Sequence, residues 1–502
     1  MNLIMLLEMA AEAMGDRIAV GSRLEGTTYN QLLQQASTAA AGFRAANVDR
    51  VLLCDESSPA VPAALFGAAW AAIPYAPLNY RLADDDLRSL AQRGGPAIAI
   101  TNAHTGLRLS GIDTIETIDR DVFLTTGSES MPESTWSMDP EEIAIILFTS
   151  GTTGPPKSAI LRHRHLVSYI VDTVDFMGAA EDEATLVSVP PYHVAGVASV
   201  LSSVYAGRRI VQLPTFDPDQ WIDTVLQEGI THAMVVPTML TRIVDAIEAR
   251  GGEPLLGVRT LAYGGGRMPP QVIRHALELF PITSFVNAYG LTETSSTISL
   301  LGPDDHRVAQ YSDDPSHKRR LASVGRPLPG IDVAVRDPHG TDLPIGSVGE
   351  IFVRGTQVAG EYLEKGSTLI DGWFPTRDNG YVDEFGYLFL QGRNDDVIVR
   401  GGENISPGEI EDALLAHHGV TDAAAIGVPC REWGEKVVVV VLADAEPPSE
   451  SELRDHVRTR LGSSRAPAHV VFIDELPYND TGKLLRRVLR ADYSHLGDGP
   501  AS

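Results

Sequence analysis

Apolar residues follow two alternating patterns along the first part of the chain, from Thr28 to Leu90. Helical spacing runs from Tyr29 to Ala45 and, in an alanine-rich stretch, from Ala60 to Ala72. A short apolar run follows each of these stretches, at Val51–Cys54 and at Ile73–Pro77, as is typical of buried strands. This alternation predicts mostly parallel sheets that are covered by helices.

The alternation resumes in the middle of the chain. Strands are predicted at Thr185–Pro190, Arg209–Leu213, His232–Pro237 and Thr260–Tyr263, and helix-like sequence follows each of them. From Val324 to Arg354, glycines and prolines separate short apolar runs instead. That change of pattern predicts a small antiparallel, barrel-like subdomain.

A domain boundary is best placed at Asn394–Asp396, where polar residues separate two apolar runs. Helix patterns at Pro407–Leu415 and Glu450–Leu461 lie beyond it, and the chain as a whole exceeds the size of one hydrophobic core. The predicted fold is therefore α/β, with a large N-terminal domain (1–394) of helix-covered, mostly parallel sheets plus the barrel-like subdomain. A small, mobile α+β domain (395–502) follows.

Charge limits the classes of partner. The 66 acidic and 40 basic residues give a net charge of −26, which argues against broad nucleic-acid binding and against docking on anionic membranes. A polyanionic substrate must then be met by local clusters of lysine and arginine. The two cysteines, Cys54 and Cys430, match no metal or redox spacing, so they are interpreted as core residues of a cytoplasmic protein.

The N-terminal stretch from Met1 to Met14 is apolar but carries Glu8 and Glu12 and has no cationic start. This pattern predicts an amphipathic first helix rather than a signal peptide. No apolar run reaches the length of a bilayer span. Two further possibilities stay open at this point: peripheral contact with lipid, and assembly into a homodimer.

A polar stretch from Thr149 to Lys157 stands between two apolar runs. It reads Thr-Ser-Gly-Thr-Thr-Gly-Pro-Pro-Lys. Because glycine lets the backbone approach an anion and orient its N–H groups toward it, the stretch predicts a phosphate-binding loop. A Walker A loop needs glycine directly before the lysine, and Pro156 stands there instead. A polar turn without a ligand is the remaining alternative.

Five later stretches combine with this loop. They are Asn287–Thr294, Trp373–Asp378, Gly386–Arg393, Gly401–Asn404 and Asn479–Lys483. The ordered set resembles the adenylate-forming superfamily of acyl-CoA synthetases, adenylation domains and luciferases over nearly the whole chain. The resemblance implies that a carboxylate attacks the α-phosphate of ATP to give acyl-AMP and pyrophosphate, and that a thiol then displaces AMP.

The resemblance also implies a nucleotide site. Tyr289 would lie against adenine, Asp378 would accept both ribose hydroxyls, and Arg393 would donate to the ribose and nearby phosphate. Thr292 would touch the α-phosphate, and Glu293 would bind Mg²⁺, a hard cation that prefers oxygen ligands. The implied ATP-binding residues are Thr149, Ser150, Gly151, Thr152, Thr153, Gly154, Lys157, Gly264, Gly265, Gly266, Asn287, Ala288, Tyr289, Gly290, Thr292, Asp378, Arg393 and Lys483.

Lys483 is the implied catalytic cation, together with Thr292 and Glu293, because an ammonium between carboxylate and α-phosphate offsets charge crowding in the transition state. Taken alone, Lys483 would be read as a surface lysine, since Asn-Asp-Thr-Gly is ordinary turn sequence. The family rotates its small domain between the two half-reactions, about a hinge that matches Asp395. Coenzyme A would then meet Gly401, Gly402, Glu403 and Trp433.

The implied acyl pocket is lined by His193, Val194, Val236, Pro237 and Gly266. Two positions depart from the family pattern. Ser158 replaces the glycine that commonly follows the loop lysine, and Arg377 stands where relatives usually carry glycine. Because a positive φ would cost arginine about 1 kcal/mol or more, we expect an adjusted turn with Arg377 directed to solvent.

The leading hypothesis is an AMP-forming acid–CoA ligase for a hydrophobic carboxylic acid, with a fatty acid as first choice. ATP, Mg²⁺ and coenzyme A are the expected cofactors. Alternatives are a fatty acyl-AMP ligase that hands its product to a carrier protein, an aryl or alicyclic acid–CoA ligase, and a catalytically silent scaffold. The short stretch between Tyr362 and Trp373 lacks the insertion of acyl-AMP ligases, and the catalytic residues argue against a silent member.

Overall fold

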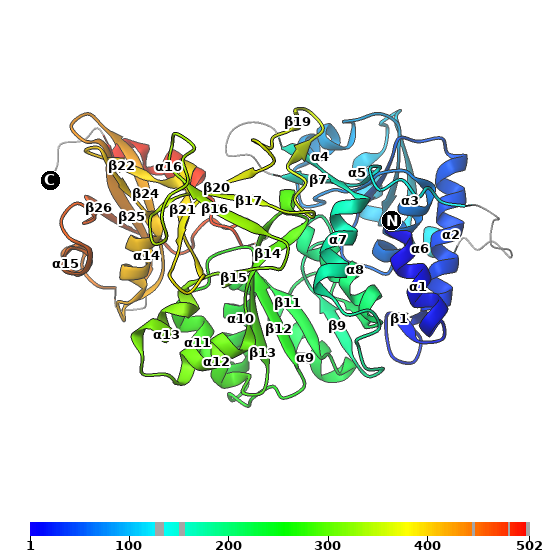
Figure 1. The fold of residues 1–502 in the computed structure, drawn as a ribbon, viewed down its shortest axis with the longest axis horizontal. Helices are drawn as coiled ribbons and strands as arrows, with labels where there is room; N and C mark the ends of the chain where they lie inside the picture. The colour runs from blue at the N-terminus through cyan, green and yellow to red at the C-terminus, as the bar shows by residue number, and fades with distance from the viewer. Residues whose placement is uncertain (126–134, 150–155, 444–446, 480–481, 498–502) are drawn as a thin grey trace.

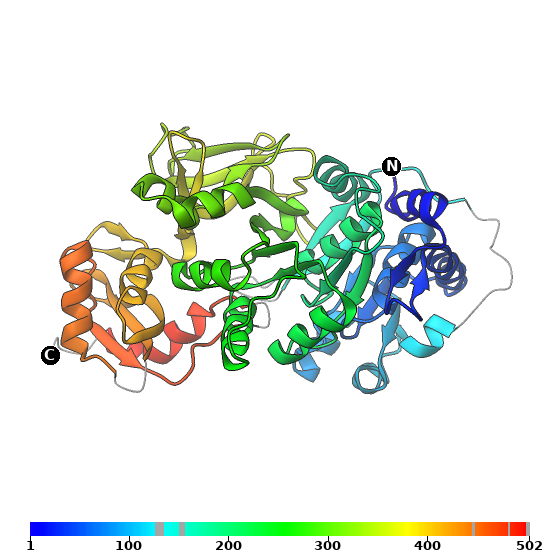
Figure 2. The same ribbon diagram turned by 90° about the horizontal axis from the view of Figure 1, so that it is seen from below.

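The computed structural model describes residues 1–125, 135–149, 156–443, 447–479 and 482–497. The N-terminal elements, in blue, lie at one end of the molecule and the C-terminal elements, in orange and red, lie at the other (Figures 1 and 2). Helix α1 (Ile4–Met14) confirms the predicted first helix and buries Ile4, Leu7 and Ala10 against the large domain. No helix among the described residues is long and apolar enough to cross a membrane.

One sheet of the large domain has eight strands, in the order β19-β18-β8-β7-β4-β3-β5-β6. Parallel pairing joins β7, β4, β3, β5 and β6, as predicted, and β8 runs antiparallel to β7. Its strands are β3 (Arg50–Cys54), β4 (Tyr75–Pro77), β5 (Ala97–Thr101), β6 (Ile115–Asp119), β7 (Ile143–Thr149), β8 (Lys157–Arg162), β18 (Glu361–Tyr362) and β19 (Gly366–Ser367). The accompanying helices are α2 (Tyr29–Ala45), α3 (Ala60–Ala71), α4 (Asp84–Ala91), α5 (Ala103–Leu109) and α6 (Arg120–Thr125).

A second sheet has nine strands, in the order β15-β14-β13-β12-β11-β9-β10-β1-β2. Its strands are β1 (Ile18–Val20), β2 (Thr27–Thr28), β9 (Ala184–Val187), β10 (Arg209–Gln212), β11 (His232–Val235), β12 (Thr260–Gly264), β13 (Ser284–Leu291), β14 (Ser296–Leu301) and β15 (Arg326–Pro327). The helices of this region are α7 (His163–Thr173), α8 (Val194–Ala206), α9 (Pro218–Glu228), α10 (Pro237–Ala249), α11 (Pro270–Leu279), α12 (Pro303–Tyr311) and α13 (Pro315–Arg319).

One predicted boundary in this sheet was wrong, and one motif proved to lie within a strand. Strand β13 continues through the start of the Asn287–Thr294 stretch to Leu291, because its backbone pairs with β12 on one side and with β14 on the other. The strand predicted to reach Pro237 ends at Val235, and Pro237 opens α10 instead. Proline favours the first helical turn, where its missing N–H leaves no hydrogen bond unmade.

The glycine- and proline-punctuated region forms an antiparallel sheet, as predicted, in the order β16-β17-β20-β21. Its strands are β16 (Asp332–Arg336), β17 (Gly349–Arg354), β20 (Phe374–Val382) and β21 (Leu388–Arg393). The one-turn helix η3 (Asn394–Asp396) follows β21 directly.

The C-terminal residues build hydrophobic clusters of their own on the two faces of one sheet. Alternate residues of β25 point to opposite faces, so that Val437, Val439 and Val441 join one cluster and Val438 and Val440 join another. The strands are β22 (Ile398–Arg400), β23 (Glu403–Ile405), β24 (Val420–Cys430), β25 (Gly434–Ala443) and β26 (His469–Phe472), and the helices are α14 (Pro407–Leu415), α15 (Glu450–Leu461) and α16 (Arg486–Tyr493).

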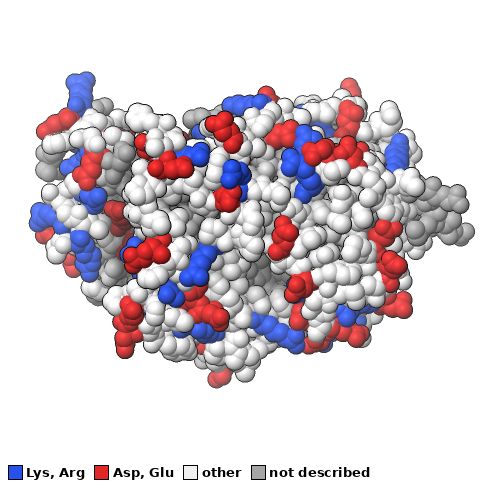
Figure 3. Space-filling view, in the orientation of Figure 1, with Lys and Arg blue, Asp and Glu red and all other residues white. Residues whose placement is uncertain are grey.

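Charged side chains of both signs are scattered over the face shown in Figure 3, and its lysines and arginines do not gather in one patch. Many of the arginines pair with nearby carboxylates. In the C-terminal region, for example, Arg465 contacts Glu403 and Glu409, and Arg486 contacts Glu411. This dispersal fits the strongly negative net charge.

Candidate functional site

Three side chains predicted to hold the nucleoside lie together between two sheets. The hydroxyl of Tyr289, on β13, donates to Oδ2 of Asp378 at 2.6 Å, and Nε of Arg393 donates to Oδ1 at 3.2 Å. Asp378 on β20 is paired in register with Arg393 on β21. Burial and the adjacent Asp378 carboxylate raise the pKa of Tyr289, so this phenol stays protonated at neutral pH.

The predicted magnesium ligand and the predicted loop lysine meet at one tyrosine. The hydroxyl of Tyr362 donates to Oε1 of Glu293 at 2.5 Å, and Nζ of Lys157 lies 5.5 Å from the centre of the same ring. The Glu293 backbone carbonyl accepts from Ala359 and Gly360 at 2.9 and 3.1 Å, which fixes η1 (Thr292–Thr294) against the strand that carries Tyr362. A carboxylate and an ammonium therefore both lie against the same tyrosine side chain.

Lys483 lies in a hairpin that reaches across to the large domain. The N–H of Lys483 donates to Oδ1 of Asn479 at 2.7 Å, and the N–H of Asn479 donates back to the Lys483 carbonyl at 2.9 Å. A Cβ placed on Gly482 would lie 2.5 Å from Oγ1 of Thr238 and 3.1 Å from Cγ2 of Val236. Because Gly482 also has a φ of +69°, this hairpin needs glycine at its closest approach to α10.

The environment of Lys483 perturbs its ammonium. Part of the side chain is open to solvent, yet the walls of the cleft surround it closely enough that burial lowers its pKa. The Arg393 cation lowers the pKa further, while Asp378 and Asp396 oppose that shift. The structure therefore brings Lys483 within electrostatic reach of the cluster around Asp378.

The residues predicted to contact the acid also converge. A Cβ on Gly265 would lie 3.6 Å from Val236, and one on Gly266 would lie 3.5 Å from Pro237 and 3.6 Å from the Gly482 carbonyl. Gly264 allows β12 to approach β13, because a Cβ there would lie 2.2 Å from the Ala288 carbonyl. The glycines thus stand between the predicted acyl residues and the lysine hairpin.

His193 caps helix α8 and precedes Val194, which is buried at the start of that helix. Its Nδ1 accepts from the Ala195 N–H at 3.2 Å. Burial lowers the pKa of His193 to about 4, so the imidazole is neutral at pH 7 and its Nε2 carries the proton. Part of its role is structural, as N-cap of α8.

Most of the predicted phosphate loop, Ser150, Gly151, Thr152, Thr153 and Gly154, lies outside the described residues. Its two ends are described, and they pair in register, Thr149 on β7 with Lys157 on β8.

The serine that follows the loop lysine has a specific partner. Oγ of Ser158 donates to Glu364 at 2.6 Å, and its N–H donates to the same carboxylate at 3.2 Å. Burial would raise the pKa of Glu364, but these hydrogen bonds prevail and lower it. Ser158 therefore links β8, the strand that follows the loop, to the segment that contains Tyr362 and Glu364.

Arg377 has a φ of +63°, in the left-handed region, and its side chain is exposed. The expected adjustment of the turn does not occur. The backbone keeps the conformation that suits glycine, at a point where the pairing of β20 with β17 is irregular. The expected solvent exposure of the side chain is found. Asp378 next to it is buried and correctly oriented toward Tyr289 and Arg393.

The residues predicted for coenzyme A lie side by side on the C-terminal domain. The Gly401 N–H donates to the Trp433 carbonyl at 2.7 Å, and a Cβ on Gly401 would lie 2.9 Å from the indole ring. Gly401 and Gly402 both have positive φ, at +60° and +83°. Glu403 pairs with Arg465, and Trp433 keeps 46% of its surface exposed.

The predicted hinge, Asp395, is the central residue of η3 between β21 and β22. Its carbonyl accepts from Arg490 on α16 at 3.0 Å, and the neighbouring Asp396 pairs with Arg486 and Arg490. The last helix is thus attached to the connection between the two domains.

Sequence reasoning missed Tyr362, Glu364 and Arg267. Tyr362 and Glu364 lie about 200 positions after the loop strand they contact, so no local spacing indicates the contact. Arg267 follows the three glycines and forms an ion pair with Asp412 on α14. A side chain at Gly408, on the same helix, would collide with the guanidinium.

The Arg267–Asp412 pair joins the two domains in the arrangement that places Lys483 near Asp378 and Arg393. For the two half-reactions that the resemblance implies, we expect Arg267→Ala to slow acyl-AMP formation by up to about fivefold, because an exposed ion pair contributes about 0–1 kcal/mol, and to leave transfer to the thiol undiminished. Single-turnover rates of each half-reaction measure the effect.

Arg354→Ala, which breaks an exposed pair with Asp332 inside the large domain, is the matched control. A double-mutant cycle with Asp412→Ala completes the test. Additive effects of the two substitutions on acyl-AMP formation would show that the pair does not hold the domains together.

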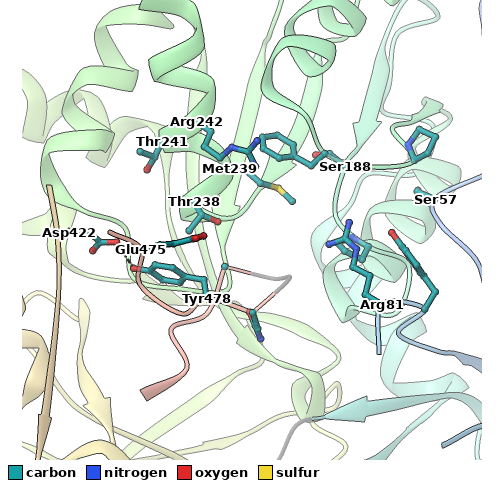
Figure 4. A pocket seen from close by; sticks show the side chains of 16 residues that line it. Ser57, Arg81, Ser188, Thr238, Met239, Thr241, Arg242, Asp422, Glu475 and Tyr478 are labelled. Atoms are coloured by element: carbon teal, nitrogen blue, oxygen red, sulfur yellow. Dashed lines mark hydrogen bonds between the residues drawn. The ribbon is translucent and has the colours of Figure 1, made fainter. Parts of the chain in front are cut away.

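A cavity of about 430 Å³ lies beside the lysine hairpin, between it and α10 (Figure 4). The large domain contributes Arg81, Ser188, Thr238, Met239 and Arg242, and the C-terminal domain contributes Asp422, Glu475 and Tyr478 (Figure 4). Its volume is within the range of small-molecule sites in proteins.

The sequence of the chain matches protein families and individual proteins that are already known. The family model of AMP-binding enzymes matches residues 7–363, and the model of the AMP-binding enzyme C-terminal domain matches residues 409–483. The chain is 32% identical to the fatty acid–[acyl-carrier-protein] ligase ScoC of Streptomyces coeruleorubidus, over 92% of this chain and 91% of that protein. It is 33% identical to the feruloyl-CoA synthase of an Amycolatopsis species, over 92% and 93% of the two chains.

Solved structures agree with the sequence relatives. The o-succinylbenzoate CoA synthetase MenE of Bacillus subtilis, in complex with its acyl-adenylate intermediate, superposes with a TM-score of 0.84 at 25% identity, over 97% of both chains. ATP-bound MatB of Rhodopseudomonas palustris gives a TM-score of 0.86 at 28% identity, over 99% of this chain and 100% of that one. The chain therefore belongs to the AMP-binding enzyme family, within the adenylate-forming superfamily that the ordered motifs indicate.

Proposed function

We propose that this protein is an AMP-forming acid–CoA ligase that activates a hydrophobic carboxylic acid with ATP and then transfers the acyl group to coenzyme A. One observation carries the proposal: the Lys483 hairpin packs on Val236, Thr238 and Gly266, within electrostatic reach of Asp378 and Arg393. A cation is thus placed where a carboxylate and a nucleotide α-phosphate would have to meet.

The proposed roles follow from the donors and acceptors at hand. Each oxygen of Asp378 already accepts one protein hydrogen bond, and its remaining lone pairs can accept the two ribose hydroxyls. Arg393 is held as a cation because Asp378 and Glu293 raise its pKa against the effect of burial. Lys157 and the hydroxyl-rich loop before it would hold the leaving pyrophosphate.

The residues present also fit a magnesium ion. Glu293 supplies a carboxylate that Tyr362 holds by a hydrogen bond, and Mg²⁺ needs few protein ligands when phosphate oxygens and water complete its shell. When bound, the ion would neutralise charge on the phosphates during displacement. The hydrogen bond from the Tyr362 hydroxyl orients the Glu293 carboxylate.

The two half-reactions need different groups in the same cleft. Lys483 would serve acyl-AMP formation, but it would then stand in the path along which the thiol approaches. We place the domain boundary at residues 394/395, with the lid domain turning about Asp395. In the arrangement described above, Gly401 contacts Trp433 and Glu403 contacts Arg465, so both contacts lie within the C-terminal domain. Rotation would bring the glycines, which leave room for a narrow thiol chain, to the nucleotide site.

A carrier protein is the second candidate acceptor, since ScoC, at 32% identity, is named a fatty acid–[acyl-carrier-protein] ligase. The feruloyl-CoA synthase and MenE are named for coenzyme A and for aromatic acids. Coenzyme A is favoured here by the Gly401–Trp433 surface, which offers an exposed indole beside two glycines of positive φ. The class of acid is left to experiment.

One panel experiment tests the proposal. We expect pyrophosphate release with ATP, Mg²⁺ and one class of acid among short, medium, long, aryl and alicyclic carboxylic acids, followed by thioester formation when coenzyme A is added. Parallel reactions with a phosphopantetheinylated carrier protein distinguish the acceptors. Pyrophosphate release without thioester in the presence of coenzyme A would refute the CoA assignment, and no release with any acid would refute the ligase.

A further inference from the structure

The turn between β13 and β14 has a strained backbone. The two strands pair as far as Leu291 and Ser296, so only the residues Thr292–Ser295 are left to close the hairpin. Ser295 has a φ of +56° and Ser296 has a φ of +112°, and both residues are buried. Positive φ suits glycine and costs other residues free energy. Such a conformation persists only where surrounding contacts hold the backbone in place.

One buried glutamine spans the two strained serines. Nε2 of Gln357 donates to the carbonyl of Thr294 at 3.0 Å and to the carbonyl of Thr297 at 2.7 Å. All three residues are buried, and a buried carbonyl that loses its donor is costly. The two hydrogen bonds therefore tie together the backbone on either side of the strain.

The main chain that follows Gln357 holds the first half of the same turn. The N–H groups of Ala359 and Gly360 donate to the Glu293 carbonyl at 2.9 and 3.1 Å. Thr292 and Glu293 themselves are partly exposed. The contacts thus restrain the backbone of the turn and leave these two side chains accessible to a ligand.

The segment that holds the turn is itself anchored to the strand that follows the phosphate loop. Tyr362 on β18 is paired with Ala159 on β8. The neighbouring Glu361 carboxylate accepts from Nε and Nη2 of Arg162 at 2.9 and 2.7 Å. A bidentate pair of this kind fixes orientation as well as distance. Through Gln357 the strained turn is therefore connected to the strand that leaves the phosphate loop.

We propose that Gln357 is a positioning residue for the binding of ATP with Mg²⁺, because it keeps the strained turn in the conformation that directs Thr292 and Glu293 toward the phosphates. The inference rests on the proposed ligase function, in which Glu293 is the magnesium ligand. The Gln357 side chain is buried and engaged by the turn, so it acts through the backbone. A relaxed turn would still carry a carboxylate, but not in the geometry that Mg²⁺ demands.

Titration calorimetry with ATP, in the absence of any carboxylic acid, tests this role without turnover. Each protein is titrated once in EDTA and once with Mg²⁺, and the ratio of the two dissociation constants measures how far the ion strengthens ATP binding. Gln357→Met keeps the length of the side chain and removes its donor. We expect this variant to lower the ratio about tenfold, as is usual when a group that orients a metal ligand is lost. ATP binding in EDTA should change little.

Relief of the strain provides a second, independent variant. Ser296→Gly lowers the cost of the positive φ, so the turn should keep its conformation with fewer restraints. Alone, this substitution should retain the wild-type ratio. Combined with Gln357→Met, it should recover part of the loss, which a simple packing defect at Gln357 would not allow.

The control is Thr283→Val, which removes another buried donor from the same sheet. Thr283 precedes β13, and its hydroxyl donates to the Val258 carbonyl at 2.7 Å. Like Gln357→Met, this variant should lower the midpoint of thermal unfolding. It should leave the ratio of dissociation constants unchanged, because it lies at the other end of β13 from the turn.

The proposal is overturned by an unchanged ratio in Gln357→Met, by an equal loss in Thr283→Val, or by a double variant without recovery. It also falls if Mg²⁺ does not strengthen ATP binding to the wild type. A wild type that binds no ATP under either condition would refute the nucleotide site of the proposed function itself, and this inference with it.

Discussion

Lys483→Ala should lower the rate of acyl-AMP formation by at least about 10²-fold, because a preorganised cation next to a developing negative charge is usually worth several kcal/mol. Transfer of the acyl group from supplied acyl-AMP to coenzyme A should stay within about twofold of the wild type, since that step would need Lys483 to be absent from the cleft. Rapid-quench measurement of each half-reaction gives both rates.

The control is Lys436→Ala, which removes a lysine from β25 of the same domain and leaves the hairpin intact. Equal loss of both half-reactions in Lys483→Ala would refute the assigned role.

The pH dependence adds an independent test of Lys483. Burial and the Arg393 cation lower its pKa, so the ammonium loses its proton at a lower pH than a free lysine does. Acyl-AMP formation should therefore be fully present below the lowered pKa and decline as the pH rises through it. Lys483→Arg, which stays charged, should remove this alkaline decline even if its maximal rate is reduced.

Asp395→Pro should have the opposite effect. Proline fixes φ at the residue that joins β21 to the lid domain, so the lid should lose its second orientation. Acyl-AMP formation should persist, whereas thioester formation should fall by about tenfold or more, as is expected when a conformational step limits the reaction. Single-turnover formation of acyl-AMP and of acyl-CoA measures the two effects.

Asp395→Ala removes the side chain but leaves φ free, and it should support both half-reactions. Unchanged thioester formation in Asp395→Pro would exclude Asp395 as the pivot. Thermal unfolding of both variants shows whether either substitution has destabilised the fold around the contact from Arg490 to the Asp395 carbonyl.

The departure at Arg377 shows where local rules and family pattern diverge. Its positive φ is retained although arginine is strained there, and the buried Asp378 that follows it keeps both of its protein partners. The surrounding strand pairing over-determines this backbone, so the strain persists where the carboxylate must be aimed. Sequence alone predicted the exposure of the side chain but not the conformation of the turn.

The local pattern by itself determined most of the elements. The helices predicted at Tyr29–Ala45, Pro407–Leu415 and Glu450–Leu461 are α2, α14 and α15 with the same bounds. Such segments are specified by apolar periodicity and by capping residues such as Thr28 and Ser449, which act within a few positions. The ordered motifs likewise identified the family. Each motif is a short stretch of sequence, and the motifs occur along the chain in the family's order.

Only the tertiary structure decided which of these sequence segments come into contact with one another. Tyr362 reaches Glu293 and Lys157, Ser158 meets Glu364, and Arg267 meets Asp412 across gaps that carry no periodic signal. The cavity of Arg81 and Arg242 likewise exists only because the lid hairpin closes over α10. The reason is physical: sequence pattern encodes interactions between neighbours along the chain, whereas a binding site is made by sheet topology and domain contact, which bring distant residues together.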